Sequence, residues 1–301
     1  MKPLISCQDI NHSFSSKQVL NDINFEIQMG ETTALVGPNG AGKTTLFSLL
    51  CHYLIPDSGE ITLLGEKVGS RALLGKIGSL PQDAKLDPRF TIQTQLEFFA
   101  RLQGFTRQQA KIECLRVLEC VDLLDTLNLK PAALSHGMSK RVSIAQALIG
   151  SPQLILLDEP TAGLDPANAR KIRQLIMTLS SQQMNFVISS HNLDELERLC
   201  STVLLLEQGK LTQQRIGSTS QAHLQTLTLL LEKTTAPCLD ILNNVQGVKQ
   251  VEAINAQEFI VRYEEAATLG FDLQLIQTLQ QHDLSYRQIS KGVSLEQQLF
   301  T

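Results

Sequence analysis

The fold of this chain follows from nine consecutive residues, Gly37-Pro38-Asn39-Gly40-Ala41-Gly42-Lys43-Thr44-Thr45. They match the phosphate-binding pattern G-x-x-x-x-G-K-[ST] at every fixed position. Residues 32–36, which precede them, are β-branched and apolar like a strand, and residues 44–50 have the apolar spacing of a helix. Because a glycine-rich loop between a strand and a helix is the context in which this pattern binds phosphate, the sequence predicts a nucleotide-binding loop.

The chemistry of this loop suits a nucleotide polyphosphate. Gly37, Gly40 and Gly42 have no Cβ, so the backbone can turn tightly and direct its N–H groups at one anion. The helix that follows adds its unpaired N–H groups and the positive end of its dipole. We expect Lys43 to neutralise the β- and γ-phosphates and the Thr44 hydroxyl to bind Mg²⁺ beside them. The alternative, a glycine-rich turn with an incidental lysine, is disfavoured by the flanking strand and helix.

Composition and charge exclude some classes of partner. The 301 residues are enough for two domains, and a hydrophobic content of 43% supplies a core. The net charge of −4 argues against a protein that coats nucleic acid, and the absence of tryptophan argues against a base-stacking surface. We therefore expect no nucleic-acid partner.

Cysteine spacing and hydropathy bear on the compartment. The cysteines are scattered and form no C-x-x-C pair, which indicates buried thiols in a reducing compartment. No apolar run is long enough to span a bilayer, and the N-terminal residues lack the features of a signal peptide. We expect a cytosolic protein, or one that a partner holds at a membrane. The six cysteines are Cys7, Cys51, Cys114, Cys120, Cys200 and Cys238.

Two carboxylates follow a fully apolar run at residues 154–157. Such a run is typical of a strand in a sheet buried on both faces, and ligands bind at the carboxyl ends of these strands. We expect Asp158 to hold Mg²⁺ through water and Glu159 to act as general base for a water that attacks the γ-phosphate. A charged turn after a strand is the alternative, and the phosphate-binding loop upstream weighs against it.

Four further positions are candidates for the same site. Ser135 and Gly137 precede a predicted helix, where an N-cap and free N–H groups suit an anion. Phe14 lies in the predicted connection Asn11–Asp22, and it is about equally well explained by packing or by stacking on a nucleotide base. His191 ends the predicted strand 186–190 and could reach a γ-phosphate, although a lone histidine is usually structural.

The chain changes pattern near residues 215–222. The first part, 1–215, alternates predicted strands and helices as in an α/β domain, and helical residues at about 85–150 suggest an inserted helical subdomain. The tail, 222–301, is predicted in the order βαββαβ, which is that of a small α+β ferredoxin-like domain. The boundary between the two parts is short and polar.

Taken together, the motifs of residues 4–215 resemble those of the nucleotide-binding subunit of an ATP-binding-cassette (ABC) transporter. Their order along the chain is that of the family, and the signature motif distinguishes it from other P-loop proteins. The matching segments are Phe14 (adenine-stacking aromatic), Gly37–Thr45 (Walker A), Gln82 (Q-loop), Leu134–Met138 (signature), Leu154–Glu159 (Walker B), Ala162–Asp165 (D-loop) and His191 (switch histidine).

The resemblance implies a fold, an activity and two cofactors. The fold would be an α/β P-loop NTPase of ABC type, with a mixed sheet core, an antiparallel β subdomain and a helical subdomain. The activity would be hydrolysis of ATP with Mg²⁺, catalysed by Glu159, His191 and Lys43, with Mg²⁺ at Thr44, Gln82 and Asp158. The nucleotide would be bound by Phe14, Gly37, Pro38, Asn39, Gly40, Ala41, Gly42, Lys43, Thr44, Thr45, Gln82, Ser135 and Gly137.

The resemblance also implies two protein partners. A second copy of the chain would close an ATP sandwich, in which Ser135 and Gly137 reach the γ-phosphate bound by the other copy. An integral membrane permease would hold the dimer at the cytoplasmic face of the membrane, and Gln82 would report the state of Mg²⁺ to it. Residues 292–300, which carry one extra residue before Phe300, are similar to the S-L-E-x-x-F ending of ATPases that serve two-gene exporters, which favours export over import.

One position departs from the family. His136 stands where the signature usually has the first of two glycines, and Met138 replaces the common glutamine. An imidazole adds bulk at this point, or it hydrogen-bonds ribose or phosphate instead. Two other functions therefore stay open besides a transporter ATPase: a soluble ABC ATPase that acts on ribosomes or DNA, and a regulatory module that binds ATP with little turnover.

Overall fold

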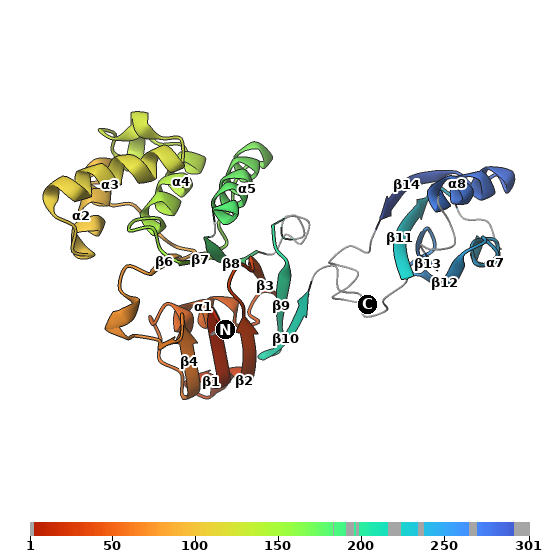
Figure 1. Cartoon of the computed structure of the whole chain (residues 1–301), viewed down its shortest axis with the longest axis horizontal. Coiled ribbons are helices and arrows are strands. Elements are labelled where there is room, and N and C mark those ends of the chain that lie inside the picture. Colours follow the sequence, from red (N-terminus) through yellow and green to blue (C-terminus); the bar gives the residue numbers. More distant parts are fainter. Residues whose placement is uncertain are drawn as a thin grey trace. The chain divides into compact units, whose positions relative to one another are not determined.

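The computed structural model describes residues 3–182, 184–190, 196, 199–215, 224–233, 238–264 and 270–291. The chain divides into two compact units, Met1–Ile216 and Gly217–Thr301. Figure 1 shows the helices and strands of each unit.

A mixed sheet of six strands forms the centre of the first unit, in the order β10-β9-β3-β8-β7-β6. All neighbours in this sheet are parallel except β10, which is antiparallel to β9. Every residue of β7 is buried, as its apolar run predicts. The strands are β3 (Thr33–Val36), β6 (Ile77–Leu80), β7 (Leu154–Asp158), β8 (Asn185–Ser189), β9 (Thr202–Glu207) and β10 (Lys210–Arg215).

An antiparallel sheet in the order β2-β1-β4-β5 forms a second layer of this unit. One apolar cluster joins this sheet, through Ile10 and Ile61, to α1 and to the mixed sheet. This packing fixes the helix that follows the phosphate-binding loop. The strands are β1 (Ile5–Phe14), β2 (Lys17–Ile27), β4 (Ser58–Leu63) and β5 (Glu66–Lys67), and α1 spans Lys43–Leu50.

The predicted connection Asn11–Asp22 is wrong. These residues extend β1 and β2 into one hairpin, in which Phe14 pairs with Lys17 across a turn at Ser15. The error has a physical cause: the stretch is too polar to show strand periodicity, and its pairing contains register shifts that break the alternation.

Three helices, α2, α3 and α4, pack together as a helical subdomain, and α5 follows β7 (Figure 1). Each of these helices begins at a residue whose side chain accepts a backbone N–H, namely Thr91, Thr106, Ser135 and Asp165. The helices are α2 (Ile92–Leu102), α3 (Arg107–Cys120), α4 (His136–Ala147) and α5 (Pro166–Ser181), with short 3-10 turns at Arg71–Leu73, Leu124–Thr126 and Pro131–Ala133.

The second unit is an antiparallel sheet in the order β12-β13-β11-β14 with two helices. Its elements run βαββαβ, the order the sequence predicts, and Leu229, Val261 and Leu275 pack in its core. The elements are β11 (Leu224–Leu231), α7 (Cys238–Asn243), β12 (Val248–Ala253), β13 (Glu258–Glu264), α8 (Phe271–Gln281) and β14 (Tyr286–Lys291). The predicted terminal turn of helix at 295–300 lies outside the described residues.

Candidate functional site

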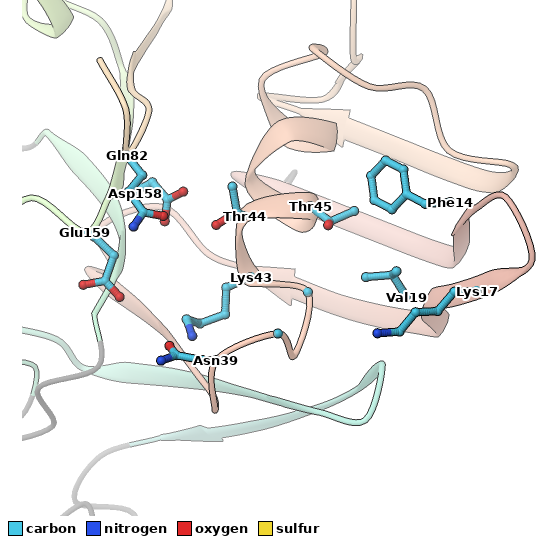
Figure 2. Close-up of a pocket in the computed structure, with 12 residues that line it drawn as sticks. Phe14, Lys17, Val19, Asn39, Lys43, Thr44, Thr45, Gln82, Asp158 and Glu159 are labelled. Atoms are coloured by element: carbon cyan, nitrogen blue, oxygen red, sulfur yellow. The ribbon is translucent and has the colours of Figure 1, made fainter. Parts of the chain in front are cut away.

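A pocket of about 470 Å³ brings the phosphate-binding loop and the two carboxylates together. Figure 2 shows Phe14 at one end and Asp158 and Glu159 at the other, with Lys43 and Thr44 between them. The pocket is lined by Phe14, Lys17, Val19, Asn39, Gly40, Gly42, Lys43, Thr44, Thr45, Gln82, Asp158 and Glu159.

The loop after β3 has the shape of an anion cradle. The Lys43 ammonium donates hydrogen bonds to the carbonyl oxygens of Gly37 and Pro38, at 2.7 and 3.2 Å, so its charge is held at the loop. A Cβ on Gly37 would lie 2.1 Å from the carbonyl oxygen of Leu206 on β9, so only glycine fits there. Gly42 has a φ of +107° and directs the chain into α1. Of the loop residues predicted to bind nucleotide, Gly37, Pro38 and Ala41 do not line the pocket.

The donor set at the other end of the pocket fits Mg²⁺. Thr44, Gln82 and Asp158 offer a hydroxyl, an amide and a carboxylate, which are the hard oxygen ligands this ion prefers. Within the described residues, His, Cys, Asp and Glu side chains form no cluster of three or more that could hold a metal. A site of this kind binds Mg²⁺ with help from substrate phosphates rather than with a full protein cage.

Ser189, which the sequence analysis did not single out, holds both carboxylate residues in place. It ends β8 directly beside Asp158, its hydroxyl donates to the Asp158 carboxylate, and it accepts the Glu159 N–H at 2.9 Å. Glu159 itself has a left-handed φ of 51°, which turns its buried side chain toward the pocket. The signal for Ser189 was a polar residue that ends a buried strand close to His191.

Lys140 is a second residue that the sequence analysis missed. It is half-buried on α4, with the carboxylates of Asp158, Glu159 and Asp83 around it. Burial lowers the pKa of Lys140, while the three negative charges act in the opposite direction. No pattern in the sequence marked it, because its place depends on how α4 packs.

Phe14 supplies the apolar end of the pocket. It is the last residue of β1 rather than part of a connection, and its ring is 49% exposed. Lys17 and Val19, across the hairpin on β2, line the same end. A half-exposed ring beside a phosphate-binding loop can stack on a base, because every base has a π-face.

The signature residues do not line this pocket. Ser135 is the N-cap of α4, and its hydroxyl accepts the Met138 N–H at 3.2 Å. Gly137 is packed against Asn168 of α5, whose side-chain atoms would lie 2.6 to 3.0 Å from a Cβ on that glycine. The signature therefore lies apart from the phosphate-binding loop of its own chain. His191, the remaining predicted catalytic residue, lies outside the described residues.

Among the described residues, no helix is long and apolar enough to cross a bilayer.

Known proteins resemble the first unit in sequence. The family model described as ABC transporter matches residues 20–162. Over 211 residues the chain is 37% identical to the Nod factor export ATP-binding protein I of Rhizobium sp. (strain N33), covering 69% of each chain. Its counterpart from Burkholderia orbicola (strain AU 1054) is 36% identical over 208 residues, or 68% of each chain.

Solved structures resemble the first unit in fold. The cbiO1 protein from Clostridium perfringens, part of the ABC transporter complex cbiONQ, is 28% identical, with a TM-score of 0.64 over 71% of this chain and 89% of the other. A dimeric ATP-binding cassette in a post-hydrolysis state, bound to ADP and Pi, has the same TM-score at 24% identity. It covers 70% of this chain and 98% of its own.

Proposed function

The chain belongs to the ABC transporter family, and from this premise we propose how its residues bind ATP, hydrolyse it and drive a membrane transporter. In this family the ATP-binding subunit hydrolyses ATP, works as a dimer and couples hydrolysis to a membrane permease. The observation that carries the proposal is one pocket that joins Lys43 and Thr44 of the phosphate-binding loop to Asp158 and Glu159.

In the proposed complex, ATP lies along this pocket with its base at Phe14 and its γ-phosphate near Glu159. The backbone N–H groups of residues 39–45 and the start of α1 bind the phosphates. Lys43 leaves its hydrogen bonds with the Gly37 and Pro38 carbonyls and moves its ammonium toward the β- and γ-phosphates.

Thr44, Gln82 and Asp158 would hold Mg²⁺ in this complex. When bound, the ion would neutralise the negative charge that develops on the phosphates during hydrolysis. Ser189 keeps the Asp158 carboxylate oriented through its hydroxyl.

Glu159 is the proposed general base. Its side chain is buried at the pocket wall, where it can take a proton from a water that attacks the γ-phosphate. The phosphoryl group passes to this water, and ADP leaves with the broken bond's electron pair. His191 is proposed to stabilise the transition state, and Ser135 and Gly137 of a second copy are proposed to cap the γ-phosphate from across the dimer.

The permease partner requires a surface, and the exposed apolar side chains of α2 supply one. Phe98 and Leu102 lie four residues apart on one face of α2 and are 56% and 68% exposed. Leu74 is another exposed apolar side chain of this unit, at 78%. Large apolar side chains exposed on one face of a helix are typical of a protein contact site.

We also propose the role of each domain and the place in the cell where the protein acts. Residues 1–215 form the nucleotide-binding domain, and residues 222–301 form an accessory domain, in line with the two compact units. The protein acts at the cytoplasmic face of the membrane, held there by its permease. The similarity to Nod factor export proteins favours an exporter.

The test is steady-state ATP hydrolysis by the full chain, alone and copurified with its permease. Glu159→Gln should retain ATP binding and lose at least about a hundredfold in turnover, the size expected for a general base. Lys43→Ala should weaken ATP binding itself, and Glu66→Gln, an exposed glutamate on β5, is the matched control. If Glu159→Gln hydrolyses ATP at the wild-type rate, the assignment of the general base is wrong.

A further inference from the structure

A buried histidine lies directly behind the proposed base-stacking ring. His12 is 7% exposed, and its imidazole meets the Phe14 ring edge to face, with centroids 4.9 Å apart and planes at 89°. The two residues are two positions apart on β1, so their side chains are on the same side of the strand. His12 does not line the nucleotide pocket, whereas Phe14 does.

The surroundings of His12 do not account for a polar ring at this position. Neither ring nitrogen has a hydrogen-bond partner in the part of the chain that the structure describes. Asp57 approaches its Nδ1 only to 3.7 Å, and the other Asp57 oxygen accepts the Ser13 N–H at 2.7 Å. Buried polar groups are normally hydrogen-bonded, so an imidazole without partners calls for a reason other than stability.

The backbone around His12 is also irregular in a way that serves the pocket. The pairing of β1 with β2 shifts on both sides of His12, which pairs with Leu20 while Ser13 pairs with Gln18. Val19 lies at this shift and lines the pocket. Bulges of this kind redirect side chains next to binding sites.

We propose that His12 is a positioning residue for ATP binding: its ring holds the Phe14 ring in the orientation that stacks on the base. This inference rests on the proposed function, since Phe14 must contact the nucleotide. A half-exposed phenylalanine at the tip of a hairpin otherwise samples several rotamers, and the nucleotide must order it at a cost in affinity. The contact with His12 restricts Phe14 before the nucleotide arrives.

The test is ATP affinity and turnover of the full chain and of variants at His12. His12→Leu, which removes the ring, should weaken ATP affinity about threefold to tenfold, the size of an edge-to-face ring contact, and should leave kcat within about twofold. His12→Phe, which keeps a ring, should bind ATP like the wild type. His282→Leu, an exposed histidine on the second unit, is the control.

The decisive comparison uses Phe14→Ala. If His12 acts through Phe14, His12→Leu has no further effect on affinity in the Phe14→Ala background. An equal loss in both backgrounds, or a loss in His12→Phe as large as in His12→Leu, would overturn the proposal, and so would unchanged affinity in His12→Leu. A wild-type chain that binds no ATP would instead overturn the proposed function itself.

Discussion

The imidazole of His136 lies against Gly163: its Nε2 is 3.4 Å from the position that a Cβ on Gly163 would take. Gly163 belongs to the segment between Glu159 and α5, and it has a left-handed φ of +73°. Gly137, which follows His136 in the chain, packs against Asn168. The Asn168 side-chain amide donates a hydrogen bond of 2.6 Å to the Asp165 carboxylate, which holds it in place. The start of α4 thus contacts the segment that follows Asp158 and Glu159 in the same chain.

Apart from this contact, His136 is exposed at the start of α4, so its imidazole adds bulk on the surface that would face a second copy's phosphates. We therefore expect His136→Gly to preserve or raise ATPase activity, measured as kcat and KM on the full chain. A collapse of activity in this variant would show that the imidazole has a positive role in turnover.

Removal of residues 222–301 tests the division into two domains. Because the two compact units have separate cores, the truncated chain should fold and bind ATP with wild-type affinity. Dimerisation or regulation of ATPase activity should weaken. The measurements are nucleotide titration and light scattering with Mg-ATP, and loss of ATP binding would contradict the two-domain assignment.

The apolar surface of α2 should be needed for the permease and not for ATP. Phe98→Glu with Leu102→Glu places two charges on that surface, so the chain should no longer copurify with its permease. ATP binding by the isolated chain should be unchanged. Met177→Glu, at an exposed methionine of α5, is the matched control. Full copurification of the double variant would place the permease contact elsewhere.

An ion pair in the helical subdomain should make stability depend on pH. Burial raises the pKa of Glu113, but hydrogen bonds from Arg116, at 2.6 Å, and from the Gly150 N–H, at 2.7 Å, outweigh it and leave the pKa below its usual value. The stabilisation by this ion pair is therefore present above the unfolded-state pKa of Glu113, which is about 4.3. It is lost as the pH falls through the lower pKa that Glu113 has in the folded state.

The Arg116→Met variant measures how much this ion pair contributes to the stability of the fold. It leaves a buried carboxylate without its partner and should cost about 2 kcal/mol in the free energy of unfolding at pH 7. The difference in the free energy of unfolding between the variant and the wild type should shrink as the pH falls through the folded-state pKa of Glu113. Arg89→Met removes a more exposed pair with Asp87 and should change stability little. A cost for Arg116→Met that is independent of pH would contradict the electrostatic explanation.

The sequence predicted those parts of the site that are contiguous along the chain. Gly37–Thr45 and Leu154–Glu159 carry their own strand and loop signals, so their place at the carboxyl ends of parallel strands followed from pattern alone. The helices and strands of the second unit were predicted for the same reason, since their hydrophobic periodicity is regular.

The sequence did not predict the residues that reach the site from other segments without belonging to a motif. Ser189, Lys140 and Lys17 lie at the site because the sheet register, the packing of α4 and the β1–β2 hairpin place them there. A polar residue at the end of a strand, the signal for Ser189, is too common to mark such a role, and no local pattern marks the two lysines. The hairpin itself was missed because its polar strands pair through bulges, which break the two-residue alternation.

The central claim is that each ATP lies between the phosphate-binding loop of one copy and the signature of another. Its most direct test mixes two inactive variants, Lys43→Ala and Ser135→Arg, and measures ATPase activity. In a mixed dimer, one site carries both defects and the other site is intact. Because random mixing makes about half of the dimers mixed, about a quarter of all sites should be intact. Activity near that level in the mixture, with none in either variant alone, is the predicted result. If mixed dimers form and activity stays absent, the site is not shared between copies and the account is wrong.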